Sequence, residues 1–127
     1  IEFADMGNTW GVHVHPEVNP HPEKGVTFDP LLGFEKGRKV REMPLSKEAM
    51  MSAKIPLEHR DYCAHKLLDY MTCTEKVWPF QLYKCDHEKH VLLNCQYEDH
   101  VLNMKEYERE RRLLVRQHKM NQQEVAH

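Results

Sequence analysis

The sequence has no long apolar run and little glycine. Only 5 of its 127 residues are glycine, while 30% are charged and the mean hydropathy is −0.77. No stretch approaches the roughly 20 apolar residues that a membrane-spanning helix needs. The first arginine is Arg38, so the N-terminal part lacks the Arg-rich pattern of a matrix presequence, and it also lacks the apolar core of a secretory signal. We therefore expect at most one domain with a small core, and a membrane association that is peripheral or made through partners.

An excess of positive charge is also missing. The chain has 18 Lys and Arg against 20 Asp and Glu, which gives a net charge of −2 with neutral histidines. This balance argues against a nucleic-acid binder that relies on bulk positive charge. Basic residues do cluster between Lys105 and Lys119, but Glu106, Glu108 and Glu110 interleave with them. We expect no nucleic-acid partner, and we expect Glu108 to pair with Arg112 one helical turn later.

Cysteine is scarce but regularly spaced. The 4 cysteines are Cys63, Cys73, Cys85 and Cys95, with nine residues within each successive pair. The segment between the pairs contains Val77-Trp78-Pro79-Phe80, which indicates a turn. The pattern predicts two helices joined by that turn, with a cysteine near each end of each helix. Even spacing of this kind indicates disulfides and an oxidising compartment.

Helix geometry selects one disulfide pairing. Ten residues of helix rise about 15 Å, whereas a disulfide needs Cα atoms closer than about 7 Å, so neither helix can bridge its own two cysteines. Pairing Cys63 with Cys85 and Cys73 with Cys95 would require parallel helices and a connection running back along a helix with nothing to bury it. We therefore predict an antiparallel hairpin with the bridges Cys63–Cys95 and Cys73–Cys85.

Apolar residues recur on the cysteine-bearing faces of both predicted helices. The first face carries Cys63, Leu67, Tyr70 and Cys73, and the second carries Cys85, Leu92 and Cys95. Glu88 also falls on the second face and is the exception to its apolar pattern. Such faces are narrow, so the hairpin buries too little apolar area to be stable without its bridges.

The predicted fold class is all-α: a disulfide-stapled antiparallel helical hairpin with an extended N-terminal arm and a long projecting C-terminal helix. We divide the chain into a proline-containing arm (1–45), the hairpin (46–96) and a C-terminal helical extension and tail (97–127). Pro16, Pro20 and Pro22 predict that the stretch from Thr9 to Lys24 contains no regular helix.

Helix boundaries follow from caps and breakers. Ser46 is a suitable N-cap for a short helix, and the first hairpin helix is expected from about Pro56 to about Cys73. The second should begin near Pro79. Neither proline nor glycine occurs from Gln81 to the end, so this helix should extend for about 35–40 residues.

The twin Cys-x(9)-Cys pattern resembles the coiled-coil-helix-coiled-coil-helix proteins of the mitochondrial intermembrane space. Three runs resemble, more specifically, a family of accessory subunits of respiratory complex I, the NADH:ubiquinone oxidoreductase. These runs are Phe28-Asp29-Pro30-Leu31-Leu32-Gly33-Phe34, Arg60-Asp61-Tyr62-Cys63-Ala64-His65, and the acidic-basic run from Met104 to Leu114.

This resemblance implies a non-catalytic structural subunit that clasps neighbouring membrane-arm subunits. Its place would be peripheral, on the intermembrane-space side of the mitochondrial inner membrane, and it would carry no cofactor and no catalytic residue. Its partners would be other complex I membrane-arm subunits and, during biogenesis, the import and oxidation machinery. The resemblance implies that a pair of apolar residues near a cysteine docks to that machinery. Two pairs are candidates, Leu67 with Tyr70 and Trp78 with Leu82, and the sequence does not decide between them.

Several residues are candidates for partner contact or modification. The apolar segment interrupted by Pro30 and Gly33 should dock into a groove of a partner, and the charged run should bind through residues of both signs. The candidate contacts are Phe28, Leu31, Leu32, Phe34, Tyr107, Arg109, Arg112, Leu113 and Leu114. Met6-Gly7-Asn8 resembles an initiation site, which makes Gly7 a candidate for myristoylation. The myristoylation pattern wants Ser or Thr at the position of Gly11, so an unmodified chain is the alternative.

Two other functions compete with the structural one. The first is a soluble assembly factor or chaperone of the same hairpin class, which would have little use for the long C-terminal helix. The second is a thiol oxidoreductase or metal carrier, for which closely spaced or adjacent cysteines are typical, and none occur. A zinc site usually has ligands two to four residues apart. Two sets come closest to that spacing: Cys85 with His87 and His90, and Cys63 with His59 and His65. We nevertheless predict that the cysteines form bridges and hold no metal.

Overall fold

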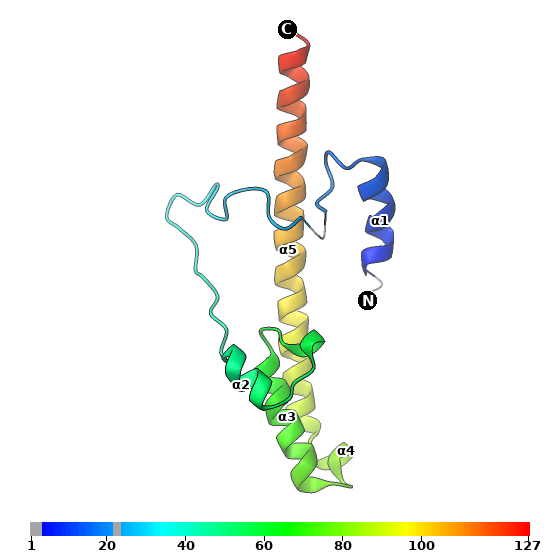
Figure 1. The fold of residues 1–127 in the computed structure, drawn as a ribbon, viewed down its shortest axis with the longest axis vertical. Helices are drawn as coiled ribbons and strands as arrows, with labels where there is room; N and C mark the ends of the chain where they lie inside the picture. Colours follow the sequence, from blue (N-terminus) through cyan, green and yellow to red (C-terminus); the bar gives the residue numbers. More distant parts are fainter. Residues whose placement is uncertain (1–3, 22–23) are drawn as a thin grey trace. The chain divides into compact units, whose positions relative to one another are not determined.

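The described part of the chain is helical and contains no strand. In a computed structural model, which describes residues 4–21 and 24–127, helix α1 spans Ala4–Val14 and helix α2 spans Lys47–Ser52. A 3-10 turn, η1, follows at Leu57–His59, and then come α3 (Ala64–Val77), α4 (Gln81–Lys84) and α5 (Asp86–Val125) (Figure 1). The predicted all-α class with a stapled hairpin and a long C-terminal helix is confirmed.

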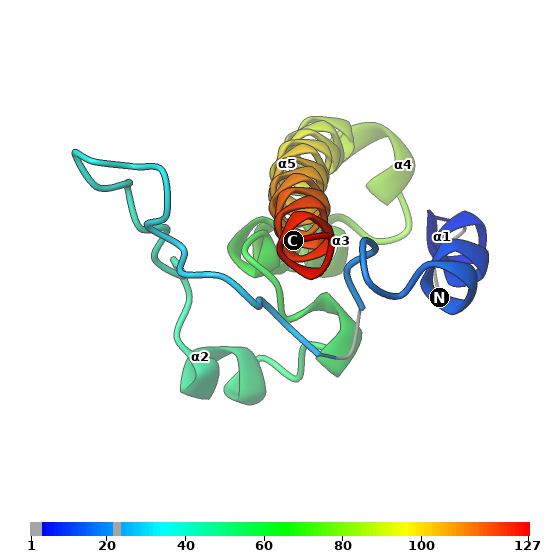
Figure 2. The same ribbon diagram turned by 90° about the horizontal axis from the view of Figure 1, so that it is seen from above.

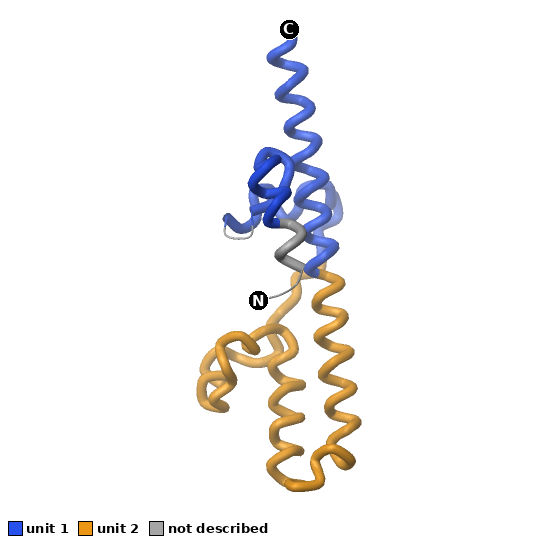
Figure 3. The backbone as a smooth tube through the Cα atoms, turned by 90° about the vertical axis from the view of Figure 1, so that its right-hand side faces the viewer, with its two compact units in different colours: residues 1–38, 103–127 blue, residues 39–102 orange. Residues whose placement is uncertain are grey.

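The chain forms two compact units, which Figure 3 colours separately. Residues 39–102 make up the hairpin unit, and residues 1–38 together with 103–127 make up the arm unit. Helix α5 contributes its first part to the hairpin unit and the rest to the arm unit. These units follow spatial contacts rather than chain order, so the division of the sequence at residues 45 and 96 stays a prediction.

Two antiparallel helices run side by side in the hairpin unit, as the orange tube in Figure 3 shows. They are α3 and the first part of α5, joined through the short α4. Two disulfides connect them: Cys63–Cys95 with Cα atoms 5.9 Å apart, and Cys73–Cys85 with Cα atoms 6.0 Å apart. These are the pairs that the cysteine spacing predicts.

The helix boundaries of the hairpin differ from the predicted ones. Regular α-helix begins at Ala64 instead of Pro56, because the preceding chain turns under local hydrogen bonds. Asp61 Oδ1 accepts the amide of Cys63 at 3.0 Å, and Arg60 Nε donates to the carbonyl of Ile55 at 2.9 Å. The second helix is interrupted at Cys85, which separates α4 from α5.

A small apolar core lies between α2 and the start of α3. Met50, Ile55 and Ala64 are buried, and Leu45, Ala53, Leu67 and Leu68 pack against them. Helix α2 begins as predicted, because Ser46 Oγ accepts the amide of Ala49 at 3.2 Å. Figure 2, which looks along α5, shows α2 to one side of that helix. A core this small leaves the hairpin dependent on its bridges.

The arm unit begins with a helix that the sequence analysis did not predict. Thr9 to Val14 belongs to α1, so the expectation of no regular helix from Thr9 to Lys24 is wrong for this part. The physical reason is that Pro16 constrains His15 but not the residues before it. Asn19 Nδ2 then donates to the carbonyls of Gly11 at 3.0 Å and His15 at 2.8 Å, which satisfies acceptors at the end of the helix.

No helix in the described ranges is both long enough and apolar enough to cross a membrane.

Candidate functional site

The charged segment of α5 holds the arm through backbone atoms. Arg109 Nη2 donates to the carbonyl of Asp29 at 3.1 Å and to that of Leu32 at 2.8 Å. The Arg109 guanidinium carbon also lies 5.5 Å from the centroid of the Phe34 ring. One planar cation therefore fixes a turn of the arm by two charged hydrogen bonds and an aromatic contact.

Two acidic residues of the same segment, one before and one after Arg109, also bind residues of the arm. Glu110 is 7% exposed, and its Oε1 accepts the amide of Thr27 at 2.9 Å. Glu106 forms an ion pair with Arg38. The hydrogen bond from Arg38 lowers the pKa of Glu106, and the hydrogen bond to Glu106 raises the pKa of Arg38. Both groups are therefore charged at neutral pH.

Arg38 also contacts the 29–34 turn of the arm. Its Nη1 donates to the carbonyl of Pro30 at 3.1 Å, and its guanidinium carbon lies 4.8 Å from the Phe34 ring centroid. Phe34 is thus contacted by two cations, one from the arm and one from α5. We call the contacts of Thr27, Arg38 and the 29–34 turn with Glu106, Arg109 and Glu110 the arm clasp.

Glu108 organises two further arginines along α5. Its Oε1 accepts from Arg111 Nη2 at 2.7 Å and from Arg112 Nε at 3.1 Å, so the predicted pairing of Glu108 with Arg112 is present. The hydrogen bond from Arg111, followed by that from Arg112, lowers the pKa of Glu108 to about 2. Glu108 therefore stays ionised at any physiological pH, and this face of the helix presents fixed charges of both signs.

The predicted contact residues fall into two groups. Leu31, Leu32, Phe34 and Arg112 are exposed, whereas Phe28, Tyr107, Arg109, Leu113 and Leu114 are half-buried. The structure brings Phe34 and Arg109 together within the chain. Contact of any of these residues with another protein stays a prediction. Gly7 lies within α1, and its acylation likewise stays a prediction.

Sequence reasoning missed most of the arm clasp. No sequence pattern marked three of its residues: Thr27, Arg38 and Glu110. Thr27 contributes only its main-chain amide, which Glu110 accepts, and Arg38 is one of several basic residues in a loop. In the hairpin unit it also missed Arg41, whose Nη1 lies 2.5 Å from Asp99 Oδ1 and whose guanidinium carbon lies 3.4 Å from the Tyr62 ring centroid. Arg41 lies in the same basic loop as Arg38, so nothing in the sequence singled it out.

The turn of the hairpin exposes several large apolar side chains. Trp78 is 73% exposed and Leu82 is 78% exposed, and Phe80 and Tyr83 are exposed beside them in the sequence. Of the two candidate docking pairs, Leu67 instead packs against the core, and Tyr70 is half-buried. The apolar residues of the turn are therefore the ones that the hairpin does not use for its own packing.

Replacing Arg109 by alanine should release the 29–34 turn. We expect the amides of this segment to exchange with deuterium about tenfold faster, which corresponds to the net loss of one or two hydrogen bonds to a charged group. Hydrogen-exchange mass spectrometry of the oxidised full chain measures this. Arg112→Ala is the matched control, because Arg112 pairs with Glu108 and the control should leave exchange in the turn unchanged. Equal protection in both variants would contradict the arm clasp.

Each helix of the hairpin carries a pair of cysteines with nine residues between them, and two disulfides join one helix to the other. This arrangement places the chain in the coiled-coil-helix-coiled-coil-helix class. A family described as NADH-ubiquinone oxidoreductase B18 subunit (NDUFB7) matches residues 44–107. The chain is similar to NADH dehydrogenase (ubiquinone) 1 beta subcomplex subunit 7 of Caenorhabditis elegans, with 47% identity over 102 residues, covering 80% of this chain and 83% of the relative. It is also similar to the protein of that name from Bos taurus, with 42% identity over 108 residues, covering 85% and 77% respectively. The chain belongs to the B18 subunit family.

Proposed function

We propose that this chain is an accessory subunit of mitochondrial NADH:ubiquinone oxidoreductase, with no catalytic residue and no cofactor of its own. The observation that carries the proposal is the 47% identity over 102 residues to a relative named as a subunit of the beta subcomplex. The match over 102 of 127 residues extends beyond the hairpin unit of residues 39–102. A free assembly factor would need only the disulfide-stapled hairpin.

The proposed mechanism is mechanical. The two disulfides make the hairpin rigid, while the arm clasp presents an ordered surface next to it in the sequence. On that surface Leu31 and Leu32 are exposed, and Arg112 adds charge. An ordered surface with apolar side chains and fixed charges can bind a neighbouring subunit without losing much conformational entropy. The chain would clasp membrane-arm subunits without moving protons or electrons.

We place the chain peripherally on the intermembrane-space side of the inner membrane. Two observations support this location. No described helix can span a bilayer. Both cysteine pairs form bridges, which persist in an oxidising compartment. The membrane association would then be made through partner subunits.

The exposed residues of the hairpin turn favour one docking pair for the import and oxidation machinery. Trp78 and Leu82 precede Cys85 by seven and three residues, so they share a face with it if the segment is helical during import. Leu67 contributes to the core and Tyr70 is half-buried, so both already have a role in packing. We therefore propose Trp78 and Leu82 as the docking pair.

Native electrophoresis of mitochondrial membranes tests the proposal. A tagged full-length chain should migrate with a large assembly that stains for NADH oxidation in the gel. Protease treatment of mitochondria with ruptured outer membranes should then digest the chain, and alkaline extraction should release it if the association is peripheral. Migration only as a small, free species would refute the subunit role and favour the assembly-factor alternative.

A further inference from the structure

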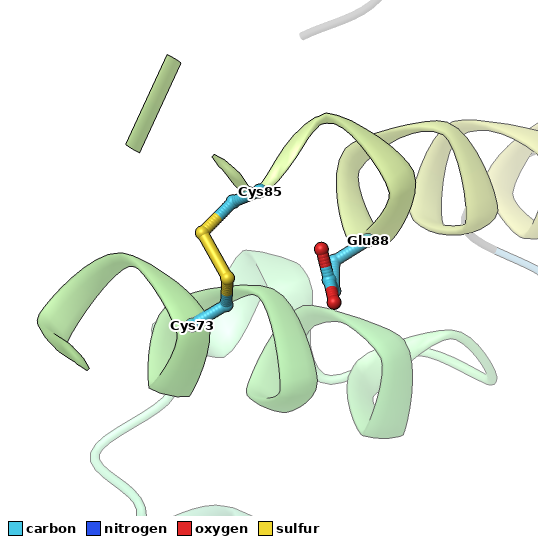
Figure 4. Close-up of side chains that lie close together, drawn as sticks. All are labelled: Cys73, Cys85 and Glu88. Carbon is cyan, nitrogen blue, oxygen red and sulfur yellow. A yellow bond between two sulfur atoms is a disulfide. The ribbon is translucent and has the colours of Figure 1, made fainter. Parts of the chain in front are cut away.

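One carboxylate lies beside a disulfide without a partner of its own. Cys73 on α3 is bridged to Cys85 at the start of α5, and Glu88 extends from the first turn of α5 toward α3 next to that bridge (Figure 4). A ligand oxygen of Glu88 and both sulfur atoms lie within 4.8 Å of one another. The Glu88 Oε2 atom is buried and has no hydrogen-bond partner.

This placement does nothing evident for the oxidised hairpin. A buried carboxylate oxygen without a donor costs free energy, and a disulfide offers no N–H or O–H to satisfy it. The position is also the one that interrupts the apolar face of α5. In the thiol form of the chain, a metal cation that accepts both thiolate and carboxylate ligands would satisfy the carboxylate and the two sulfurs together.

We propose that Cys73, Cys85 and Glu88 bind a zinc ion in the thiol form of the chain, before the Cys73–Cys85 bridge exists. Zinc accepts thiolate and carboxylate ligands in one tetrahedral site, at about 2.3 Å to sulfur and about 2.0–2.2 Å to oxygen, and water completes the site. Cys85 and Glu88 are three residues apart at the start of one helix, and Cys73 faces them from the other. Once the sulfurs are no longer bonded, small side-chain movements bring the three ligand atoms to these distances.

Zinc binding needs no added reductant, because the chain is synthesised with four thiols. Two thiols lose their protons as one Zn²⁺ binds, which gives two zinc–thiolate bonds and releases two protons. When a disulfide-bearing oxidant later accepts two electrons from these sulfurs, the sulfur–sulfur bond forms and the zinc ion leaves. Zinc site and bridge therefore exclude each other.

The inference goes beyond the proposed subunit role and does not depend on it. A bound zinc ion would hold α3 next to α5 before oxidation and would protect one cysteine pair from wrong partners. The other pair provides an internal comparison. Across the described ranges of the chain, Cys73, Cys85 and Glu88 form the one group of three such ligands, so Cys63 and Cys95 lack a third.

Zinc titration of the reduced full-length chain tests the site. The chain is reduced with a phosphine under anaerobic conditions, the phosphine is removed, and Zn²⁺ is titrated against a chromophoric chelator. We expect one ion per chain, with release of that ion when the chain is oxidised. Glu88→Gln should weaken binding by about tenfold or more, whereas Glu75→Gln, on α3 but outside the group, should bind like the wild type.

Cysteine variants and cobalt spectra decide which sulfurs are ligands. Replacing Cys73 and Cys85 by serine should abolish binding, whereas replacing Cys63 and Cys95 should preserve it. With Co²⁺ in place of Zn²⁺ in the reduced wild-type chain, the thiolate-to-metal absorption band should have the intensity of two thiolates, and this readout needs no variant. The proposal is overturned if Glu88→Gln binds like the wild type, if both double variants lose binding equally, or if the band reports four thiolates.

Discussion

Replacing Cys63 and Cys95 together by serine should lower the free energy of unfolding of the oxidised chain by about 3–4 kcal/mol. This bridge joins residues 32 apart in sequence, so it restricts the unfolded chain more than the other bridge, which joins residues 12 apart. Cys63 is only 1% exposed, so the new hydroxyl group would also be buried. Against the 5–15 kcal/mol typical of a folded domain, this loss is a large fraction.

Urea denaturation followed by far-ultraviolet circular dichroism measures this loss. The matched comparison is the variant with serine at Cys73 and Cys85. Its free energy of unfolding should fall by somewhat less, about 3 kcal/mol. In cells, either change should reduce the steady-state amount of the protein. An unchanged denaturation midpoint in both variants would mean that the core around Ile55 stabilises the hairpin alone, which would contradict the structural role of the bridges.

Truncation after Met104 should leave a folded hairpin that no longer joins its complex. The truncation retains residues 39–102, with both disulfides and the buried core. It removes Glu106, Arg109 and Glu110, which anchor the arm. Native electrophoresis should show almost complete loss from the NADH-oxidising assembly, while circular dichroism of the purified truncate should still show helices and a cooperative unfolding transition.

Truncation after Met120 is the control for length. It shortens α5 but keeps every residue of the arm clasp, so incorporation should persist. If the shorter chain that ends at Met104 were incorporated normally, the proposed role of the charged helix and the arm in binding neighbouring subunits would be refuted. Loss of helix signal in that chain would instead mean that the hairpin does not fold without the rest of α5.

The hairpin was predictable because its determinants are local and periodic. The rise of an α-helix excludes a bridge within either helix, and the short connection between the helices favours the antiparallel pairing. The absence of proline and glycine from Gln81 onward is enough to predict the long helix. The exact helix starts were not predictable. They depend on a turn before Cys63, where Asp61 Oδ1 accepts the Cys63 amide, and on the interruption at Cys85.

The arm clasp was not predictable for a different reason. Arg109 binds the carbonyl groups of Asp29 and Leu32, and every residue type carries a carbonyl group. Glu110 binds the amide of Thr27 in the same way. Such main-chain contacts leave no pattern in the sequence of the arm, whereas the side-chain partner Phe34 was among the predicted contact residues. Helix α1 was missed because the effect of Pro16 was extended to residues that precede the constrained position.

Recognition through main-chain atoms has an evolutionary consequence. A mutation at Leu32 keeps the carbonyl that Arg109 needs. Selection on the arm clasp therefore falls on Arg109 and, within the turn, on Phe34, whose ring both arginines of the arm clasp contact, and on Asp29, whose side chain accepts the amide of Leu31. The exposed positions Leu31 and Leu32 are then free to change to suit the surface of the neighbouring subunit, while the attachment of the turn to Arg109 stays the same. In lineages whose neighbouring subunits have diverged, the exposed side chains of the arm could therefore change one substitution at a time.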